Sequence, residues 1–150
     1  MAQSLSNILI HLVFSTKYRQ PLITRSIEQE LYKYINSIYS SCNSPLITIG
    51  GESDHLHSLF SISRTYSIAD IVEEVKKESS KWIKRKGREF RGFQWQVGYG
   101  AFSISPSHIN LVKQYISNQK IHHQRRDFKE EFLALLEKYD VEYDPRYIWD

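Results

Sequence analysis

Two histidines separated by a single residue, His55 and His57, lie near the middle of the chain. Residues 55–63 are predicted to form a strand, in which side chains two positions apart point to the same side. Two neutral imidazoles on one side suit a divalent ion such as Mn²⁺, Co²⁺, Ni²⁺ or Zn²⁺, and the preceding Asp54 could orient one ring as a hydrogen-bond partner. The alternative for an isolated pair of this kind is two solvated surface histidines.

Tyr115 and Gln119 form a second group with chemical potential. On a helix, residues four apart lie on the same face. A tyrosine hydroxyl has an ordinary pKa of about 10 and is a poor nucleophile while protonated. A metal at a phosphate group can offset this and permit a covalent intermediate on tyrosine, and the carboxamide oxygen of Gln119 would add a ligand that suits Mg²⁺. Because the chain has ten tyrosines, ordinary packing is the alternative for Tyr115 taken alone.

The composition is that of a globular protein. The chain has 150 residues, of which 41% are hydrophobic, and we expect residues 1–150 to form a single domain. A single cysteine, Cys42, excludes an internal disulfide. The apolar run from Ile8 to Phe14 is interrupted by His11 and lacks the basic flank of a signal peptide. No stretch reaches the roughly 18 apolar residues of a membrane span, so we expect a cytoplasmic protein with no membrane partner.

Charge is distributed unevenly along the chain. The net charge is +3, yet the segment from Lys76 to Arg91 contains eight basic and two acidic residues, whereas the segment from Asp127 to Asp150 contains eight acidic and three basic ones. A concentrated basic segment is a candidate surface for binding phosphate groups. A solvated helix face is the alternative interpretation of this run.

The elements that must position these residues follow from hydrophobic periodicity and turn signals. We predict strands over residues 5–14, 46–50, 55–63, 93–97 and 101–105, with a turn at Gly50–Gly51. We predict helices over 25–41, from the N-cap Ser67 to near Gly87, from Ser105–Pro106 onward, and over about 127–138. The order β-α-β-β-α-β with extra C-terminal helices predicts an α+β fold of the ferredoxin-like or RRM-like type. Such a fold has an antiparallel sheet with helices on one face.

Motifs spread over nearly the whole chain resemble the single-tyrosine HUH transposases of bacterial insertion sequences. The motifs are HLVFSTKYR from His11, DHLH from Asp54, WQVGYGAFS from Trp95, YISNQ from Tyr115 followed by His122 and His123, and EYD from Glu142 with Tyr147 and Trp149. The resemblance implies that Tyr115 is the nucleophile and that His55, His57 and Gln119 are metal ligands for Mg²⁺ or Mn²⁺. It also implies cleavage and rejoining of single-stranded DNA with hairpin ends, a 5′-phosphotyrosine intermediate, and a homodimer in which Tyr115 acts in its own or its partner's site.

Several basic residues are candidates for contacting the DNA. They are Lys17, Arg19, Lys77, Lys81, Lys84, Arg85, Lys120, His122 and His123. Exposed surface is the alternative for each of them, and for His11 we expect a satisfied strand histidine. Trp95, Tyr99 and Phe102 could stack on bases, but an apolar core is the favoured interpretation. The alternative function is a non-catalytic, domesticated protein that binds single-stranded or hairpin nucleic acid.

Overall fold

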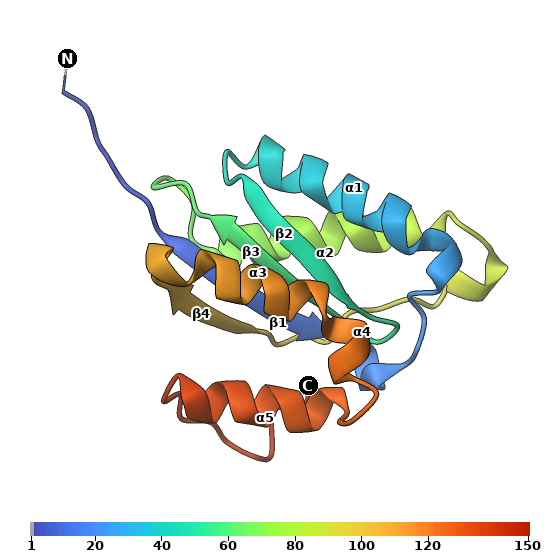
Figure 1. Cartoon of the computed structure of the whole chain (residues 1–150). Coiled ribbons are helices and arrows are strands. Elements are labelled where there is room, and N and C mark those ends of the chain that lie inside the picture. The colour runs from blue at the N-terminus through green and yellow to red at the C-terminus, as the bar shows by residue number, and fades with distance from the viewer. Residues whose placement is uncertain (1) are drawn as a thin grey trace.

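The computed structural model describes residues 2–150 and is built around a four-stranded antiparallel sheet (Figure 1). The strand order is β2-β3-β1-β4. The strands are β1 (Leu9–Ser15), β2 (Leu46–Glu52), β3 (His55–Ser61) and β4 (Gly100–Ile104). The expected α+β fold with an antiparallel sheet is therefore confirmed.

Strand β1 lies in the interior of the sheet and sets the two faces by alternation. Leu12 and Phe14 point into the main hydrophobic core, whereas Val13 joins a second apolar cluster on the other face. In the antiparallel pairing of β1 with β3, Val13 stands opposite His57 and Ser15 opposite His55. This register puts His55 and His57 on the face away from the main core.

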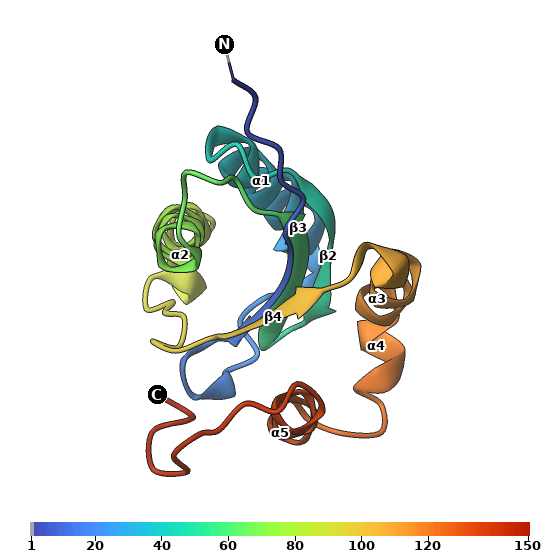
Figure 2. The same cartoon turned by 90° about the vertical axis from the view of Figure 1, so that its left-hand side faces the viewer.

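Two long helices cover the face that carries the main core (Figure 2). They are α1 (Arg25–Ser41) and α2 (Ile68–Lys84). The predicted N-cap of α2 is present, because the Ser67 hydroxyl accepts from the Asp70 amide and the Asp70 carboxylate accepts from the Ser67 amide. Short 3₁₀ turns complete the connections at η1 (Lys17–Arg19), η2 (Arg88–Phe90) and η3 (Pro106–His108).

The C-terminal helices lie on the opposite face of the sheet (Figure 2). They are α3 (Ile109–Ser117), α4 (Gln119–His122) and α5 (Phe128–Lys138). Helix α5 is anchored by a buried apolar cluster that contains Val13, Phe102, Phe128, Phe132, Leu135 and Leu136. Burying each large apolar side chain contributes about 1.5–3 kcal/mol, so α5 is a firmly attached part of the fold.

A close approach between α3 and β2 depends on Gly50. A Cβ atom at this position would lie 2.6 Å from the backbone oxygen of Ile116, closer than real side chains come. Glycine therefore lets α3 rest directly on β2. Because Tyr115 directly precedes Ile116 in α3, this contact also fixes the distance between the Tyr115 backbone and the sheet.

Two local predictions are wrong. Residues 93–97 form no named strand, and only an isolated bridge joins Trp95 to Thr16. The predicted turn at Gly50–Gly51 lies within β2, and the chain reverses at Ser53–Asp54 instead. At Gly51 a Cβ atom would lie 2.2 Å from the backbone oxygen of His55, so this glycine serves a close backbone approach within β2, where sequence alone suggests a turn. The C-terminal tail packs on the body of the protein, since Ile148 and Trp149 lie against the apolar cluster that anchors α5.

Within residues 2–150, every helix is too short or too polar to cross a lipid bilayer.

Candidate active site

His55 and His57 on β3 are fully buried. Nδ1 of each ring contacts a polar side chain. Nδ1 of His55 donates to Oδ1 of Asp54 at 2.7 Å, which is the orienting contact expected from the sequence. Nδ1 of His57 lies 2.8 Å from Nε2 of His11 on the neighbouring strand. Partners of this kind fix ring orientation in metal sites, and they leave Nε2 of both rings facing the helices that cover this face.

Gln119 and Tyr115 reach the same centre from the helices above β2. Oε1 of Gln119 lies 2.8 Å from Nε2 of His55. The ring of Tyr115 lies 5.7 Å from that of His57, centroid to centroid, and stacks at 4.9 Å on His122. The four residues that the sequence singled out for chemistry, His55, His57, Tyr115 and Gln119, therefore meet in one place.

Glu131, on helix α5, completes the cluster and was not predicted from the sequence. Its side chain is fully buried. Oε1 lies 3.0 Å from Nε2 of His57 and 3.0 Å from Nε2 of His123. Oε2 accepts hydrogen bonds from the Tyr115 hydroxyl and from Nε2 of Gln119. The sequence did carry one signal, because an acidic residue on the apolar face of a helix is unusual.

Burial and the Glu131 charge set the protonation states of the cluster. Burial lowers the pKa of His57 to about 4, although Glu131 opposes the shift, and burial beside His57 lowers the pKa of His11 to about 3. Burial and the adjacent carboxylate raise the pKa of Tyr115. Burial alone would raise the pKa of Glu131, but hydrogen bonds from His123 and His57 hold it well below its usual range. At neutral pH, His57 is therefore neutral, Tyr115 protonated and Glu131 ionised.

The arrangement of donor atoms fits a divalent cation. His55, His57 and Glu131 each offer one ligand atom, and these atoms lie within 4.8 Å of one another. Nε2 of His55 also lies 2.8 Å from the carbonyl oxygen of Gln119, which is therefore placed to serve as a further ligand atom. Ligands at about 2.1 Å along perpendicular directions are about 3 Å apart, and Oε1 of Glu131 lies 3.0 and 3.5 Å from the two imidazole nitrogens.

The predicted DNA-contacting residues do not gather around this centre. Lys77, Lys81, Lys84 and Arg85 lie on or just after α2, across the sheet from Tyr115 (Figure 2). Lys77 and Lys81 pair with Glu74 and Glu78. Nζ of Lys120 bonds Glu28 at 2.8 Å and Glu52 at 3.0 Å, and Nη1 of Arg19 donates to the Trp149 carbonyl. Of the predicted set, only His122 and His123 contact Tyr115 or Glu131.

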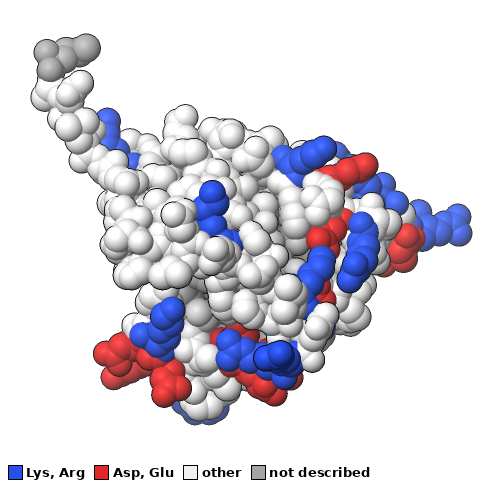
Figure 3. Space-filling view, in the orientation of Figure 1, with Lys and Arg blue, Asp and Glu red and all other residues white. Residues whose placement is uncertain are grey.

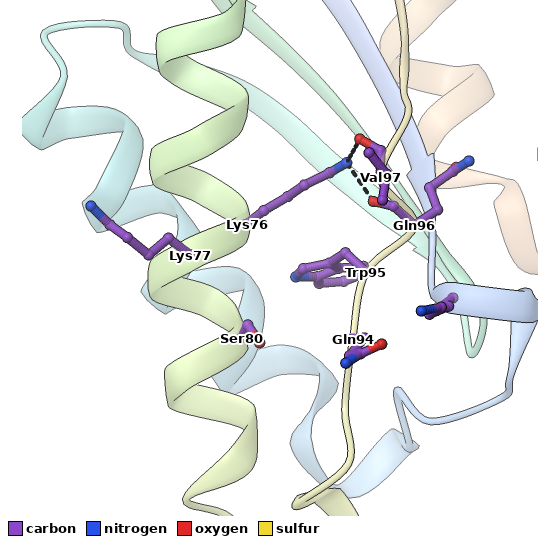
Figure 4. A pocket seen from close by; sticks show the side chains of 8 residues that line it. Lys76, Lys77, Ser80, Gln94, Trp95, Gln96 and Val97 are labelled. Carbon is purple, nitrogen blue, oxygen red and sulfur yellow. Dashed lines mark hydrogen bonds between the residues drawn. The ribbon is translucent and has the colours of Figure 1, made fainter. Parts of the chain in front are cut away.

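A pocket of about 480 Å³ lies between α2 and the segment before β4 (Figure 4). Its lining includes Lys17, Lys76, Lys77 and the residues from Gln94 to Val97. Nζ of Lys76 donates to the carbonyls of Gln96, Val97 and Gly98 at 2.7, 3.1 and 2.8 Å. Trp95 is buried against Phe14 and Phe93, and Phe102 is buried in the α5 cluster, so the core interpretation of both is confirmed.

A second pocket, of about 390 Å³, is lined by Ile121, His122, Arg125 and Arg126. His122 separates this pocket from the Tyr115 ring, on which it stacks. On the face that carries α3 to α5, positive and negative side chains alternate along the right-hand and lower edges (Figure 3). Arg125 and Arg126 are exposed and follow His122, which stacks on Tyr115, by three and four residues.

A protein-family comparison matches residues 4–119 to the family described as "Transposase IS200 like". The match covers the histidine pair, Tyr115 and Gln119, and it ends before Glu131. No curated protein is significantly similar to the chain.

Two solved structures share the fold. One is a crystal structure of a protein from Deinococcus radiodurans R1, provisionally described as a transposase. It has 22% identity and a TM-score of 0.62, and the match covers 79% of this chain and 98% of that one. The other is a REP-associated tyrosine transposase bound to a REP hairpin. It has 13% identity and a TM-score of 0.62, and the match covers 82% of this chain and 72% of that one.

Proposed function

Because the chain belongs to the IS200-like transposase family, we propose that it cleaves and rejoins single-stranded DNA at insertion-sequence ends, with Tyr115 as nucleophile. The observation that carries this proposal is the placement of the Tyr115 hydroxyl in a buried polar cluster with His57, Gln119 and Glu131. A tyrosine used only for packing needs no such set of buried polar partners. Burying polar and charged groups lowers the stability of a fold, and clusters of buried titratable groups are concentrated at functional sites.

In the proposed reaction, the Tyr115 oxygen attacks the scissile phosphorus in line with the leaving 3′-oxygen. The bond from tyrosine oxygen to phosphorus forms while the bond from phosphorus to the 3′-oxygen breaks. The products are a 5′-phosphotyrosine and a free 3′-hydroxyl, and attack by a 3′-hydroxyl on the phosphotyrosine reverses the step and joins strands. The chain contributes by positioning, since Ile116 against Gly50 and Glu131 against the hydroxyl fix where the tyrosine lies.

His55, His57 and an oxygen of Gln119 are the residues that we propose as metal ligands, with Mg²⁺ or Mn²⁺ as the ion. Asp54 and His11, which contact Nδ1 of His55 and of His57, would orient both rings so that Nε2 faces the ion. The bound ion would withdraw charge from the phosphate oxygens. The low pKa of His57 supports this role because a neutral ring keeps its lone pair at neutral pH.

The substrate that we propose is single-stranded DNA flanked by an imperfect hairpin. The hairpin bound by the REP-associated transposase of the same fold supports this substrate class. Arg125 and Arg126, beside the His122 that stacks on Tyr115, offer positive charge where the phosphate must approach. We further propose that residues 1–150 act as one domain, because α5 supplies a residue of the site, and that the protein forms a homodimer.

The test is to incubate the purified protein with a labelled library of single-stranded and hairpin oligonucleotides in Mg²⁺ or Mn²⁺, and to separate the products on denaturing gels. A shifted protein band that carries the label, and that disappears in excess EDTA, is the expected result. Binding without any covalent product, across the library and with both metals, would contradict the proposal and favour the non-catalytic alternative.

A further inference from the structure

The carboxylate of Glu131 contacts both Tyr115, the proposed nucleophile, and His57, a proposed metal ligand. Its two oxygens face different partners. Oε2 accepts from the Tyr115 hydroxyl, and Oε1 faces Nε2 of His57 at 3.0 Å and Nε2 of His55 at 3.5 Å. Within residues 2–150, His55, His57 and Glu131 are the His, Cys, Asp and Glu side chains grouped closely enough to hold a metal ion.

We propose that Glu131 belongs to the site of the strand-transfer reaction, with Oε1 as an anionic metal ligand beside the histidines and Oε2 as the acceptor that positions the Tyr115 hydroxyl. The inference rests on the proposed function and adds to it a residue outside the family match, which ends at Gln119. Glu131 is placed for both roles, because Oε2 accepts from Tyr115 while Oε1 lies 3.0 Å from Nε2 of His57. Gln119 donates to the same Oε2 at 2.8 Å and so fixes which oxygen faces the tyrosine.

A purely structural role explains Glu131 less well. Helix α5 is already anchored by Phe128 and Phe132, which flank Glu131 and are buried against the sheet. A leucine at position 131 would serve that anchoring without the cost of burying a charge. Because of this apolar packing, we expect α5 to stay in place during the reaction and not to be displaced by the DNA.

Glu131→Gln is the discriminating variant, because it keeps the size of the side chain but cannot supply a negatively charged ligand. The control is Glu130→Gln, since Glu130 is the exposed neighbour on the same helix. Two quantities are measured for each protein: the rate at which a saturating oligonucleotide becomes covalently attached, and the affinity for Mn²⁺ alone by electron paramagnetic resonance.

We expect Glu131→Gln to slow attachment at least about tenfold and to weaken Mn²⁺ binding about tenfold, with affinity for the oligonucleotide unchanged. Glu130→Gln should match the wild type in both. Attachment at the wild-type rate, or faster, would overturn the proposal, and a faster rate would identify Glu131 as an obstruction. If the wild type forms no adduct, the proposed function fails, and the Mn²⁺ measurement still decides the metal role of Glu131: unchanged affinity overturns it.

Circular dichroism checks that Glu131→Gln is folded. If it is not, Glu131→Asp replaces it, because aspartate keeps the charge but withdraws the carboxylate from the tyrosine by one methylene. Slow attachment with a folded Asp variant supports the proposal, and wild-type attachment overturns it.

Discussion

The ring of Tyr115 lies 5.7 Å from the ring of His57, centroid to centroid, within one chain. Helix α3 is seated on the chain's own β2 by the contact between Ile116 and Gly50. The family resemblance left open whether the tyrosine serves its own or a partner's site. This geometry favours action within one subunit.

Mixing two inactive variants tests that point. His57→Ala lacks a ligand and Tyr115→Phe lacks the nucleophile, so neither should cleave alone. If each chain uses its own tyrosine, a mixture prepared under conditions of subunit exchange stays inactive. Light scattering establishes whether a dimer is present. Cleavage by the mixture would show instead that α3 completes the site of the neighbouring subunit.

Removing a proposed metal ligand should abolish covalent attachment without unfolding the protein. His57→Ala leaves the sheet intact but loses one of two imidazole ligands, so we expect Mn²⁺ affinity to fall at least about tenfold and the adduct to disappear. His108→Ala is the control, because His108 is exposed at the start of α3. An adduct of normal yield from His57→Ala, or from wild type in excess EDTA, would exclude metal assistance.

Gly50→Ala should weaken the packing of α3, the helix that carries Tyr115, on β2. The new methyl group would lie 2.6 Å from the Ile116 carbonyl, and backbone must move to relieve it. We expect a loss of about 1–3 kcal/mol in the free energy of unfolding, measured by urea denaturation, together with slower attachment. Gly92→Ala is the matched control, since nothing lies within 4 Å of a Cβ there. Equal stability of the two variants would contradict the close approach.

The pair Arg125 and Arg126 and the pair Lys84 and Arg85 should contribute differently to DNA binding and to covalent attachment. Each phosphate contact on a single strand contributes about −0.7 to the slope of log affinity against log salt. Arg125→Ala with Arg126→Ala should reduce the slope by about 1.4 and slow attachment, because both residues border the pocket beside His122. Lys84→Ala with Arg85→Ala, across the sheet, should reduce the slope without slowing attachment at saturating DNA. Unchanged slopes in both double variants would show that neither surface contacts the DNA phosphates.

The local elements of the site were predictable because their periodicity is contained in short segments. The i, i+2 spacing of His55 and His57 on a strand, and the i, i+4 spacing of Tyr115 and Gln119, each define a shared face. The helix from Arg25 to Ser41 and the N-cap of α2 were predictable from the sequence in the same way.

The partners of these residues were not predictable, because they depend on register and docking. His11 meets His57 across 46 residues of sequence, and the pairing follows only from the β1–β3 register. Glu131 meets His57 across 74 residues through the docking of α5. Periodicity predicted the helix that carries Glu131, but nothing in the sequence states which surface its apolar face covers.

The most direct test of the account is the identity of the residue that carries DNA after cleavage. Wild-type protein is trapped with an oligonucleotide that it cleaves, digested with trypsin, and the modified peptide is sequenced by mass spectrometry. We predict a phosphate linkage on Tyr115 and no adduct from Tyr115→Phe, while the exposed-tyrosine control Tyr147→Phe reacts normally. DNA attached to any other of the ten tyrosines, or an adduct of normal yield from Tyr115→Phe, would contradict the account.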